Sequence, residues 1–412
     1  MSKHLAIDRP CPGTPVRRYD GWFEVSGWAA ASEPITDIRV RADDGPWYRA
    51  YYCLPRPDVE AAHPKLTSSG RSGFQGFAQG PADATRIEVQ ATYGTPSKTF
   101  AKAADIASDV REIQVADTAA HVCPWCGSTN TRYEESVRRG PFRMITCGHC
   151  DFGFAEPLPA AHALGAIYET EYWDHAPLGP DALAPSKDTG LVCDFMKRFG
   201  NDGKRVFEMG CGQGSLLYGL HHKGMQVQGQ DLSSNSARAL QDKFRIDIWR
   251  EPLTRFPHDT KFDCIVSRHV LEHSLTPADD VRWMRDHLAP GGIIVMLMPN
   301  RRSLAAELLG STWEWFVPPI HLGYLAPRTL QQSEEVAGLR LKLLTTREGD
   351  GASLIPTLRA FLDYERGHLT AWQLARCEEV LQTAPDGLET LITNGGGPAG
   401  HGQEMIAVMA AN

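Results

Sequence analysis

The chain has 412 residues and a formal net charge of −8 at pH 7, and 42% of its residues are hydrophobic. This length predicts two or three domains, each able to bury a core of its own. The acidic balance argues against a nucleic-acid partner, because counterion release requires clustered Lys and Arg. No apolar run approaches the ~20 residues that cross a bilayer, and residues 1–12 lack a signal-peptide core, so we expect a cytoplasmic protein without membrane insertion.

Residues 19–100 consist of short alternating stretches separated by turn sequences. Ile38 to Arg41 and Arg86 to Ala91 alternate apolar and polar side chains, as half-buried strands do. We therefore predict an all-β sandwich as an accessory domain over residues 1–110. Residues 101–120 are rich in alanine and charge, which predicts a linker or a short helix. The tryptophans of this region favour core positions, with a sugar-stacking surface as the alternative; they are Trp22, Trp28 and Trp47.

Two close cysteine pairs follow, Cys123-Pro-Trp-Cys126 and Cys147-Gly-His-Cys150, with twenty residues between them. This spacing matches the zinc-ribbon template, in which each pair forms a knuckle that directs two thiolates at one tetrahedral ion. We predict a zinc ribbon over residues 118–160 that holds a structural Zn2+, because four sulfur ligands leave no coordination position for water. Two alternatives remain open: unligated cysteines, and replacement of one thiolate by His121 or His149.

The stretch from Val206 to Gly214 is an apolar run that ends in Glu208 and continues with glycines at every second position. It predicts a buried parallel strand, a tight turn whose bare backbone admits a ligand, and a helix that begins near Gln213. A dinucleotide fingerprint would need a glycine where this chain has Ser215. A carboxylate beneath the turn would also repel a pyrophosphate, whereas it favours the ammonium and sulfonium charges of S-adenosylmethionine (SAM). Asp231 ends the next apolar stretch, where it could accept both ribose hydroxyls.

Together, these motifs resemble those of class I SAM-dependent methyltransferases, and the resemblance covers residues 165–412. The motifs are Glu208-x-Gly210-x-Gly212-x-Gly214, Asp231, Phe262 to Val266 and Val270 to His273. The resemblance implies a Rossmann-like α/β domain over residues 161–412, with a doubly wound sheet whose seventh strand is antiparallel.

The same resemblance implies roles for individual residues. Glu208 and the glycines Gly210, Gly212 and Gly214 would line the methionine end of the donor, and Asp231 would hold the ribose. The segment from Ser267 through His269 to His273 would face the reacting methyl group. Family tyrosines that close over the methionine end are matched by Tyr168 and Tyr172, for which packing against the zinc ribbon is the alternative.

Alternation of helices and apolar strands predicts a parallel sheet with helices on both faces. The expected helices span residues 188–199, 213–223, 234–244 and 276–288, the last of them ending at Pro290-Gly-Gly292. The expected strands after the glycine turn span residues 225–230, 262–266, 293–298, 339–346 and 404–410. Residues 355–383 have helical periodicity, which predicts an insertion over about 355–400 that shapes the acceptor pocket or a subunit contact.

In methyl transfer the protein mainly aligns the reactants and excludes water, and a hydroxyl acceptor must lose its proton. The candidate proton acceptors are His269, His273 and His321, with Glu272 as a partner. We favour His321, because it follows the fifth strand, where the ligand crevice of such a sheet opens. The His321-x-x-Tyr324 stretch also resembles the one that carries the proposed base in zinc-ribbon methyltransferases of sugar and polysaccharide pathways. The alternatives are a structural role for His321, and structural or cofactor contacts for His273 and His269.

The residue before His321 bears on the acceptor. Sugar C-methylating relatives tend to have an acid there, which would help to remove a proton next to a carbonyl, but this chain has Ile320. We therefore predict that a sugar hydroxyl of a nucleotide sugar or glycan intermediate is methylated. The alternatives are C-methylation of a nucleotide-linked ketosugar, ribosomal RNA methylation and a non-catalytic assembly protein; an oligomer is compatible with each. Three aromatics could stack on a sugar, cover the cofactor or form core, namely Trp313, Trp315 and Phe316.

Overall fold

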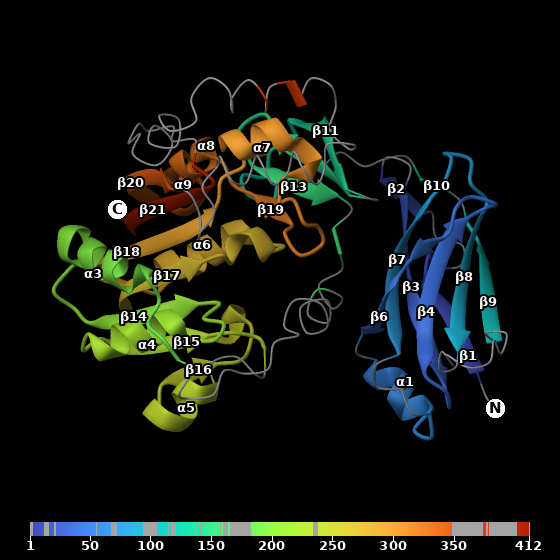
Figure 1. Cartoon of the computed structure of the whole chain (residues 1–412), viewed down its shortest axis with the longest axis horizontal. Coiled ribbons are helices and arrows are strands. Elements are labelled where there is room, and N and C mark those ends of the chain that lie inside the picture. Colours follow the sequence, from blue (N-terminus) through green and yellow to red (C-terminus); the bar gives the residue numbers. More distant parts are fainter. Residues whose placement is uncertain are drawn as a thin grey trace. The chain divides into compact units, whose positions relative to one another are not determined.

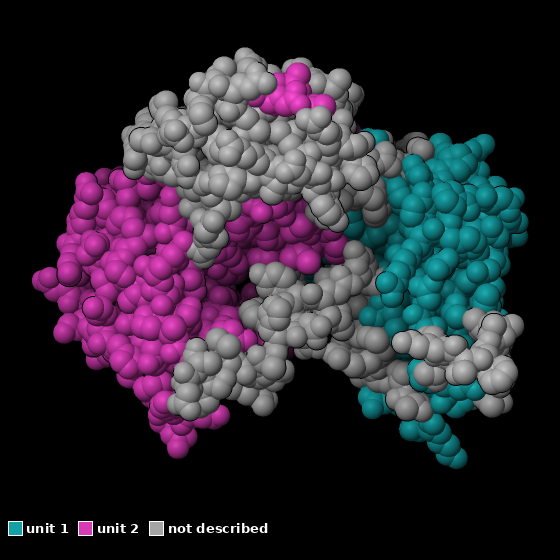
Figure 2. All heavy atoms as spheres, in the orientation of Figure 1, with its two compact units in different colours: residues 1–121, 140–143, 156–174 teal, residues 122–139, 144–155, 175–412 magenta. Residues whose placement is uncertain are grey.

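The chain forms two compact units in a computed structural model (Figures 1 and 2). Unit 1 contains residues 1–121, 140–143 and 156–174, and unit 2 contains residues 122–139, 144–155 and 175–412. The structure describes residues 3–11, 16–19, 22–54, 56–66, 72–93, 105–113, 115–116, 121–139, 142–156, 158–159, 164, 183–233, 238–347, 374–375, 378 and 402–411. Within these ranges, no helix combines the length and apolarity needed to cross a membrane.

In the residues that the structure describes, unit 1 contains two β-sheets and the short helix α1 (Pro57–Ala62). One sheet has the strand order β10-β2-β3-β7-β6 with β1 paired to β3, and the other has the order β5-β4-β8-β9. Alternate residues of β8 are buried, and Phe23, Val40 and Val89 belong to one core cluster that draws on both sheets. The strands are β1 (Lys3–Arg9), β2 (Val16–Tyr19), β3 (Trp22–Ala31), β4 (Ile35–Ala42), β5 (Tyr48–Arg49), β6 (Tyr51–Leu54), β7 (Gly73–Gln79), β8 (Arg86–Tyr93), β9 (Asp105–Glu112) and β10 (Val115–Ala116).

The linker or short helix expected over residues 101–120 is wrong for the part that the structure describes. Strand β9 pairs with β8 along its whole length, from Tyr93 opposite Asp105 to Arg86 opposite Glu112. It is an edge strand of its sheet, and its even-numbered residues Ile106 and Val110 are about half exposed. Charges on an exposed edge strand discourage pairing with other chains, and they also gave this segment the composition of a linker.

Unit 2 contains a twisted sheet of seven strands in the order β16-β15-β14-β17-β18-β21-β20 (Figure 1). Strand β21 is antiparallel to both of its neighbours, and the pairings from β16 to β18 are parallel. This mixed sheet confirms the expected Rossmann-like fold with an antiparallel seventh strand. The strands are β14 (Arg205–Met209), β15 (Gln226–Gln230), β16 (Asp247–Trp249), β17 (Phe262–Arg268), β18 (Leu288–Pro299), β20 (Leu339–Arg347) and β21 (Glu404–Ala411).

Helices pack on both faces of this sheet because alternate side chains of its strands point to opposite sides. Val206 of β14 lies in one core cluster with residues of α3 and α4, whereas Phe207 lies in another with residues of α6. Glu208 therefore points to the side of α3 and α4. The helices are α3 (Asp188–Phe199), α4 (Ser215–His222), α5 (Arg238–Phe244), α6 (Pro277–Asp286), α7 (Leu304–Leu309), α8 (Pro327–Gln331) and α9 (Ser333–Ala337).

Two boundaries differ from the prediction. Helix α6 ends at Asp286 and β18 begins at Leu288, so Pro290-Gly-Gly292 lies inside the strand as an irregularity in its pairing with β17. Gly291 has φ +72°, a backbone conformation that glycine adopts without strain. Helix α4 starts at Ser215 because Gly214, at φ +80°, is its N-cap residue.

The two cysteine pairs lie in the same compact unit as the seven-stranded sheet. We call residues 122–139 and 144–155 the cysteine module. Its strands β11 (Thr131–Arg139), β12 (Phe142–Cys147) and β13 (Gly153–Glu156) form a sheet that continues into β19 (Gly323–Tyr324). The insertion expected over about 355–400, and both Tyr168 and Tyr172, fall outside the described residues apart from 374–375 and 378.

Candidate functional site

The glycine turn lies at the carboxyl end of β14, where ligands bind in open α/β sheets. Gly210, Gly212 and Gly214 all have positive φ, at +63°, +52° and +80°. A side chain at Gly210 would also collide with its surroundings, because an added Cβ would lie 2.5 Å from Cγ2 of Val270. The turn therefore depends on glycine for both its backbone conformation and its packing.

Asp231 holds this turn in place from the end of β15. One carboxylate oxygen accepts the N–H of Gly212 at 2.9 Å, and the other accepts the N–H of Ser233 at 2.9 Å. Sequence reasoning placed Asp231 at this edge for its contact with a ribose and missed its contacts with the main chain. Each carboxylate oxygen has a second lone pair, so the side chain can hold the turn and still accept a ligand hydroxyl.

Glu208 lies beneath the turn and is fully buried. Within the described residues, neither of its carboxylate oxygens has a hydrogen-bond partner. Burial raises the pKa of Glu208 to about 7, although the guanidinium of Arg268, with Nη2 3.5 Å from Oε1, acts in the opposite direction. A buried carboxylate with unused hydrogen-bonding capacity, beside a turn that leaves no room for side chains, fits a small cationic ligand.

Arg268 also begins a chain of alternating charges along the carboxyl edge of the sheet. Its Nη1 lies 3.5 Å from Asp188, and Asp188 is 2.8 Å from Nη2 of Arg347. The guanidinium of Arg347 also pairs with Glu404, its register partner on the neighbouring strand. Glu404 in turn contacts Nε2 of His269 at 2.7 Å.

His269 connects this chain to the residues expected on the acceptor side. Its Nδ1 lies 3.3 Å from Oε1 of Glu272. Burial opposes the charge, but the carboxylates of Glu272 and Glu404 outweigh it and raise the pKa of His269 to about 9. His269 is therefore protonated at neutral pH and unsuited to accept a proton. Ser267, the other residue expected near the donor, is buried in β17 and is the register partner of Met209 just before the turn.

Glu272, His273 and His321 form a compact cluster. Their ligand atoms all lie within 4.8 Å of one another, and the two imidazole rings meet edge to face at 4.7 Å. Nδ1 of His273 lies 3.0 Å from the carbonyl of Ile320, and Nδ1 of His321 lies 2.8 Å from the carbonyl of Trp315. A carbonyl only accepts, so Nδ1 of His321 carries the proton and Nε2 is the basic atom of that ring. Two imidazoles and a carboxylate could also hold a divalent cation.

The electrostatics of this cluster favour neutral histidines beside an ionised acid. Burial, reinforced by His273, lowers the pKa of His321 to about 4, and burial also lowers the pKa of His273. Burial would raise the pKa of Glu272, but its ion pair with His269 and the nearby imidazoles bring it to about 2. His321 is thus unprotonated at neutral pH and can accept a proton, although it is a weaker base than a free histidine.

The aromatic residues near the cluster divide into two groups. Trp313 and Phe316 are buried in a core cluster with Tyr324, which is the structural alternative considered for them. Trp315 instead stacks on two histidines, with ring centroids 5.3 Å from His269 and 5.8 Å from His321. Trp315 therefore forms part of the wall around the cluster.

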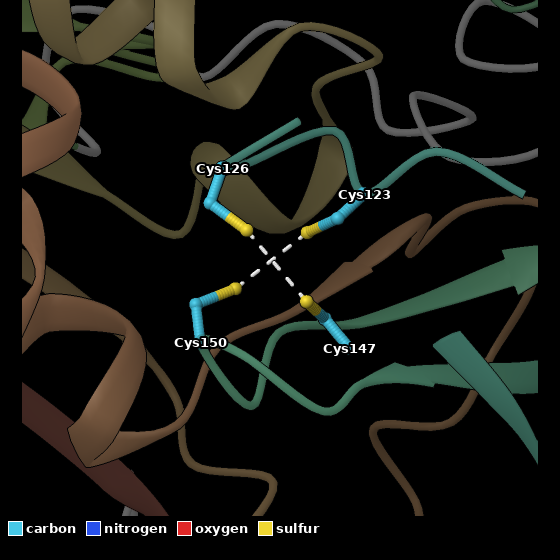
Figure 3. Close-up of side chains that lie close together, drawn as sticks. All are labelled: Cys123, Cys126, Cys147 and Cys150. Atoms are coloured by element: carbon cyan, nitrogen blue, oxygen red, sulfur yellow. Dashed lines mark hydrogen bonds between the residues drawn. The ribbon is translucent and has the colours of Figure 1, made fainter. Parts of the chain in front are cut away.

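The four cysteines of the cysteine module converge on one point (Figure 3). Cys123 Sγ lies 3.5 Å from Cys150 Sγ, and Cys126 Sγ lies 3.6 Å from Cys147 Sγ, so the two contacts cross. All four are free thiols and three are buried. Neither histidine considered as a replacement ligand belongs to the group. Four converging sulfurs fit a soft tetrahedral ion such as Zn2+.

Comparison with known proteins identifies the class of the seven-stranded domain. Residues 186–343 match a family model described as a methyltransferase domain. The ubiquinone biosynthesis O-methyltransferase of Psychrobacter cryohalolentis is 28% identical over 168 residues, which cover 35% of this chain and 65% of that protein. The enzyme of the same name from Dinoroseobacter shibae is 28% identical over 225 residues, covering 52% of this chain and 85% of that protein.

Among solved structures, a SAM-dependent methyltransferase from Archaeoglobus fulgidus is similar at 16% identity and a TM-score of 0.35, covering 54% of this chain and 93% of that one. The family match and the curated relatives support the predicted methyltransferase domain over residues 186–343. The chain spans slightly less than two thirds of the length of the first curated relative.

Proposed function

We propose that the protein is an enzyme that transfers the methyl group of SAM to an oxygen of a small-molecule acceptor. The observation that carries the proposal is the fully buried Glu208, which has no hydrogen-bond partner among the described residues and lies beneath a turn of three positive-φ glycines. A carboxylate there complements a donor that carries ammonium and sulfonium charges. Donor binding is assigned to Glu208, Gly210, Gly212, Gly214, Asp231, Ser267 and His269, with Tyr168 and Tyr172 as expected from the sequence.

When bound, SAM supplies a methyl carbon that is activated by its sulfonium. The acceptor hydroxyl loses its proton as the new bond forms, and Nε2 of His321 is the atom that we assign to take it. Glu272 is ionised within the same cluster, so it would stabilise the imidazolium that results. His321 is fixed through Nδ1 by the main-chain carbonyl of Trp315, which keeps its Nε2 available in a defined direction.

We propose a sugar hydroxyl, free as a nucleotide sugar or within a glycan intermediate, as the acceptor. The His-x-x-Tyr stretch and Ile320 support this choice through the resemblance described above. A second candidate follows from the curated relatives, which are named as O-methyltransferases of ubiquinone biosynthesis. Both candidates present a hydroxyl, so the same proton acceptor serves either. For the cysteine module, we propose a structural Zn2+ held by Cys123, Cys126, Cys147 and Cys150.

A labelled-methyl assay tests the function. Purified protein is incubated with radiolabelled SAM and a panel of nucleotide sugars, glycan intermediates and ubiquinone precursors, and products are identified by mass spectrometry. We expect an O-methylated product from one class only. Exchange of a substrate proton next to a carbonyl with deuterated water would instead indicate C-methylation. If no class of acceptor is methylated and calorimetry detects no SAM binding, the proposed methyltransferase activity is refuted.

The proton acceptor is tested with a matched pair of histidine variants. His321→Gln should lower turnover by about 10²–10⁴-fold, the usual contribution of a general base, with little change in donor affinity. His287→Gln is the control, because His287 is also buried and also bonded through Nδ1 to a carbonyl, that of Trp283, but lies outside the cluster. Unchanged turnover in His321→Gln would place the proton acceptor elsewhere.

A further inference from the structure

Leu322, the residue after His321, makes main-chain hydrogen bonds in two directions. Leu322 donates its N–H to the carbonyl of Glu272 at 2.6 Å, and its own carbonyl accepts the N–H of Ala155 from the cysteine module at 2.8 Å. The next two residues form β19, which pairs with β13 of the module: Gly323 lies opposite Phe154 and Tyr324 opposite Gly153. Leu322 therefore connects the cluster of Glu272, His273 and His321 to the cysteine module through main-chain hydrogen bonds.

A buried arginine adds a side-chain connection. Arg301 follows β18 and is almost fully buried, and it donates to four residues of the cysteine module, among them Met144 through its sulfur. Its Nη1 contacts both the carbonyl of Asp151 at 2.9 Å and the carboxylate of Asp151 at 2.5 Å. Its Nη2 contacts Glu134 at 2.7 Å and Thr146 at 2.8 Å. The main-chain N–H of Arg301 is bonded to the carbonyl of Leu325, so the same residue also fixes the end of the His321 segment.

Both connections involve residues that closely follow the knuckle of Cys147 and Cys150, namely Asp151 and the residues of β13. Asp151 directly follows Cys150 and has φ +62°, a left-handed conformation that Asp and Asn adopt more readily than other non-glycine residues. Asp151 donates its N–H to the carbonyl of Cys147. The N–H of Cys147 in turn donates to the carbonyl of Phe152. A metal ion that holds the two thiolates of this knuckle would stabilise this turn, because the free energy of metal binding is also free energy of folding.

The knuckle of Cys147 and Cys150 packs closely against residues 321–324, which carry His321. A Cβ added to Gly323 would lie 2.8 Å from the ring of Phe152, so the two elements are in direct contact. On the other side, Thr329 donates its hydroxyl to the carbonyl of Cys150 at 3.0 Å. Movement of the knuckle must therefore move the segment that includes residues 321–324.

We propose that the cysteine module is a positioning element for the proton acceptor: metal held at the four cysteines fixes Asp151, and Asp151 with Arg301 fixes the segment that carries His321. The inference rests on the proposed role of His321. Its consequence is that turnover depends on the knuckle, whereas donor binding at the glycine turn does not. Misplacement of a reacting group by about 1 Å can cost on the order of 10²-fold in rate.

The test compares Asp151→Asn with the wild-type enzyme, both carrying their metal. Asparagine tolerates the positive φ of this position but removes the charge that pairs with Arg301. We expect turnover to fall by about 10-fold to 10²-fold, and affinity for S-adenosylhomocysteine to stay the same. Hydrogen exchange should become faster at the amides of Ala155 and Leu322 and stay unchanged at Phe207 in β14. Arg301→Met is the second variant and should have the larger effect.

Turnover, affinity for S-adenosylhomocysteine and amide exchange are also measured for a control variant. Arg255→Gln breaks an exposed ion pair with Glu251, 2.9 Å long, and should change none of these quantities. The inference fails if Asp151→Asn leaves exchange at Leu322 and turnover unchanged. It also fails if donor affinity and exchange at Phe207 change together with turnover, because the module would then act on general stability. Absence of methyl transfer in the wild type would refute the proposed function, and amide exchange would still decide the coupling.

Discussion

Glu208→Gln tests whether the carboxylate of Glu208 lowers the stability of the fold while it favours binding of SAM. The carboxylate of Glu208 is fully buried, has no hydrogen-bond partner among the described residues, and faces one cation, Arg268. In the free protein this arrangement disfavours the ionised acid, which is why its pKa is raised from 4.5 to about 7. Glutamine keeps the shape of the side chain and removes the charge, so the variant should change stability and donor binding in opposite directions.

The magnitude follows from the raised pKa. One pKa unit corresponds to about 1.4 kcal/mol, so a rise from 4.5 to about 7 amounts to about 3 kcal/mol. A group whose pKa is higher in the folded state binds protons more tightly there, so its ionisation destabilises the fold as the pH rises. The penalty is absent below pH 4.5, grows between pH 4.5 and about 7, and is complete above that. Relative to Glu208→Gln, the wild type should therefore lose about 3 kcal/mol of stability across this range.

Donor affinity should have the opposite dependence on pH. The cationic donor favours the ionised carboxylate, so wild-type affinity for SAM should rise as the pH passes through 7, and Glu208→Gln should bind weakly with little dependence on pH. Urea denaturation between pH 5 and 8 measures the first effect, and calorimetry with SAM measures the second. 5′-Methylthioadenosine, which lacks the amino-acid end, is the control ligand and should not respond. Equal pH dependence of stability in both proteins would refute the account of Glu208.

Three further predictions concern the same unit. Gly210→Ala should destabilise the fold by about 2–5 kcal/mol, measured by denaturation, because φ is +63° and the new Cβ would meet Val270 at 2.5 Å; combination with Val270→Ala should recover part of this loss. Asp231→Ala should weaken binding of S-adenosylhomocysteine in calorimetry and accelerate amide exchange at Gly212 and Ser233, and full affinity would remove Asp231 from the donor site. Removal of metal by a chelator should lower the melting temperature, and Cd2+ should restore it better than Mn2+, because the four sulfur ligands are soft.

The central strands of the unit 2 sheet were predictable because they are buried on both faces and read as apolar runs between helical segments. Strand β21 was placed almost to the residue for this reason, and the predicted bounds of the edge strand β20, most of whose residues are only partly buried, also agree with the structure. Strand β9 was missed because an exposed edge strand needs no apolar run, and its alanines and charges look like those of a linker. Pro290-Gly-Gly292 was predicted to end a helix, because proline and glycine are typical of helix ends. The same residue types also suit an irregularity inside a strand, which is where the structure places them.

The candidate site was predictable where it is local in sequence. The glycine turn and Glu208 come from one stretch, and Asp231 follows the next strand, so strand order alone places them together. Arg347 and Glu404 were missed because their contact depends on the register of two strands that are 57 positions apart in the chain. The joining of the cysteine module to the sheet was missed for a similar reason, since β19 has two residues and no periodic pattern.

The charge chain connects the two places that we propose for the donor and for the proton acceptor. In the part of the chain that the structure describes, Asp188 lies between Arg268 and Arg347, and Glu404 lies between Arg347 and His269, so both inner carboxylates have two cationic partners. The carboxylates at the two ends, Glu208 and Glu272, each have one. At one end Glu272 is held ionised, because its pKa is lowered to about 2, whereas at the other end the pKa of Glu208 is raised to about 7, so a further cation beside it would favour its ionised form. One end faces the glycine turn, where a cationic donor would bind, and the other faces His321, where a proton would arrive.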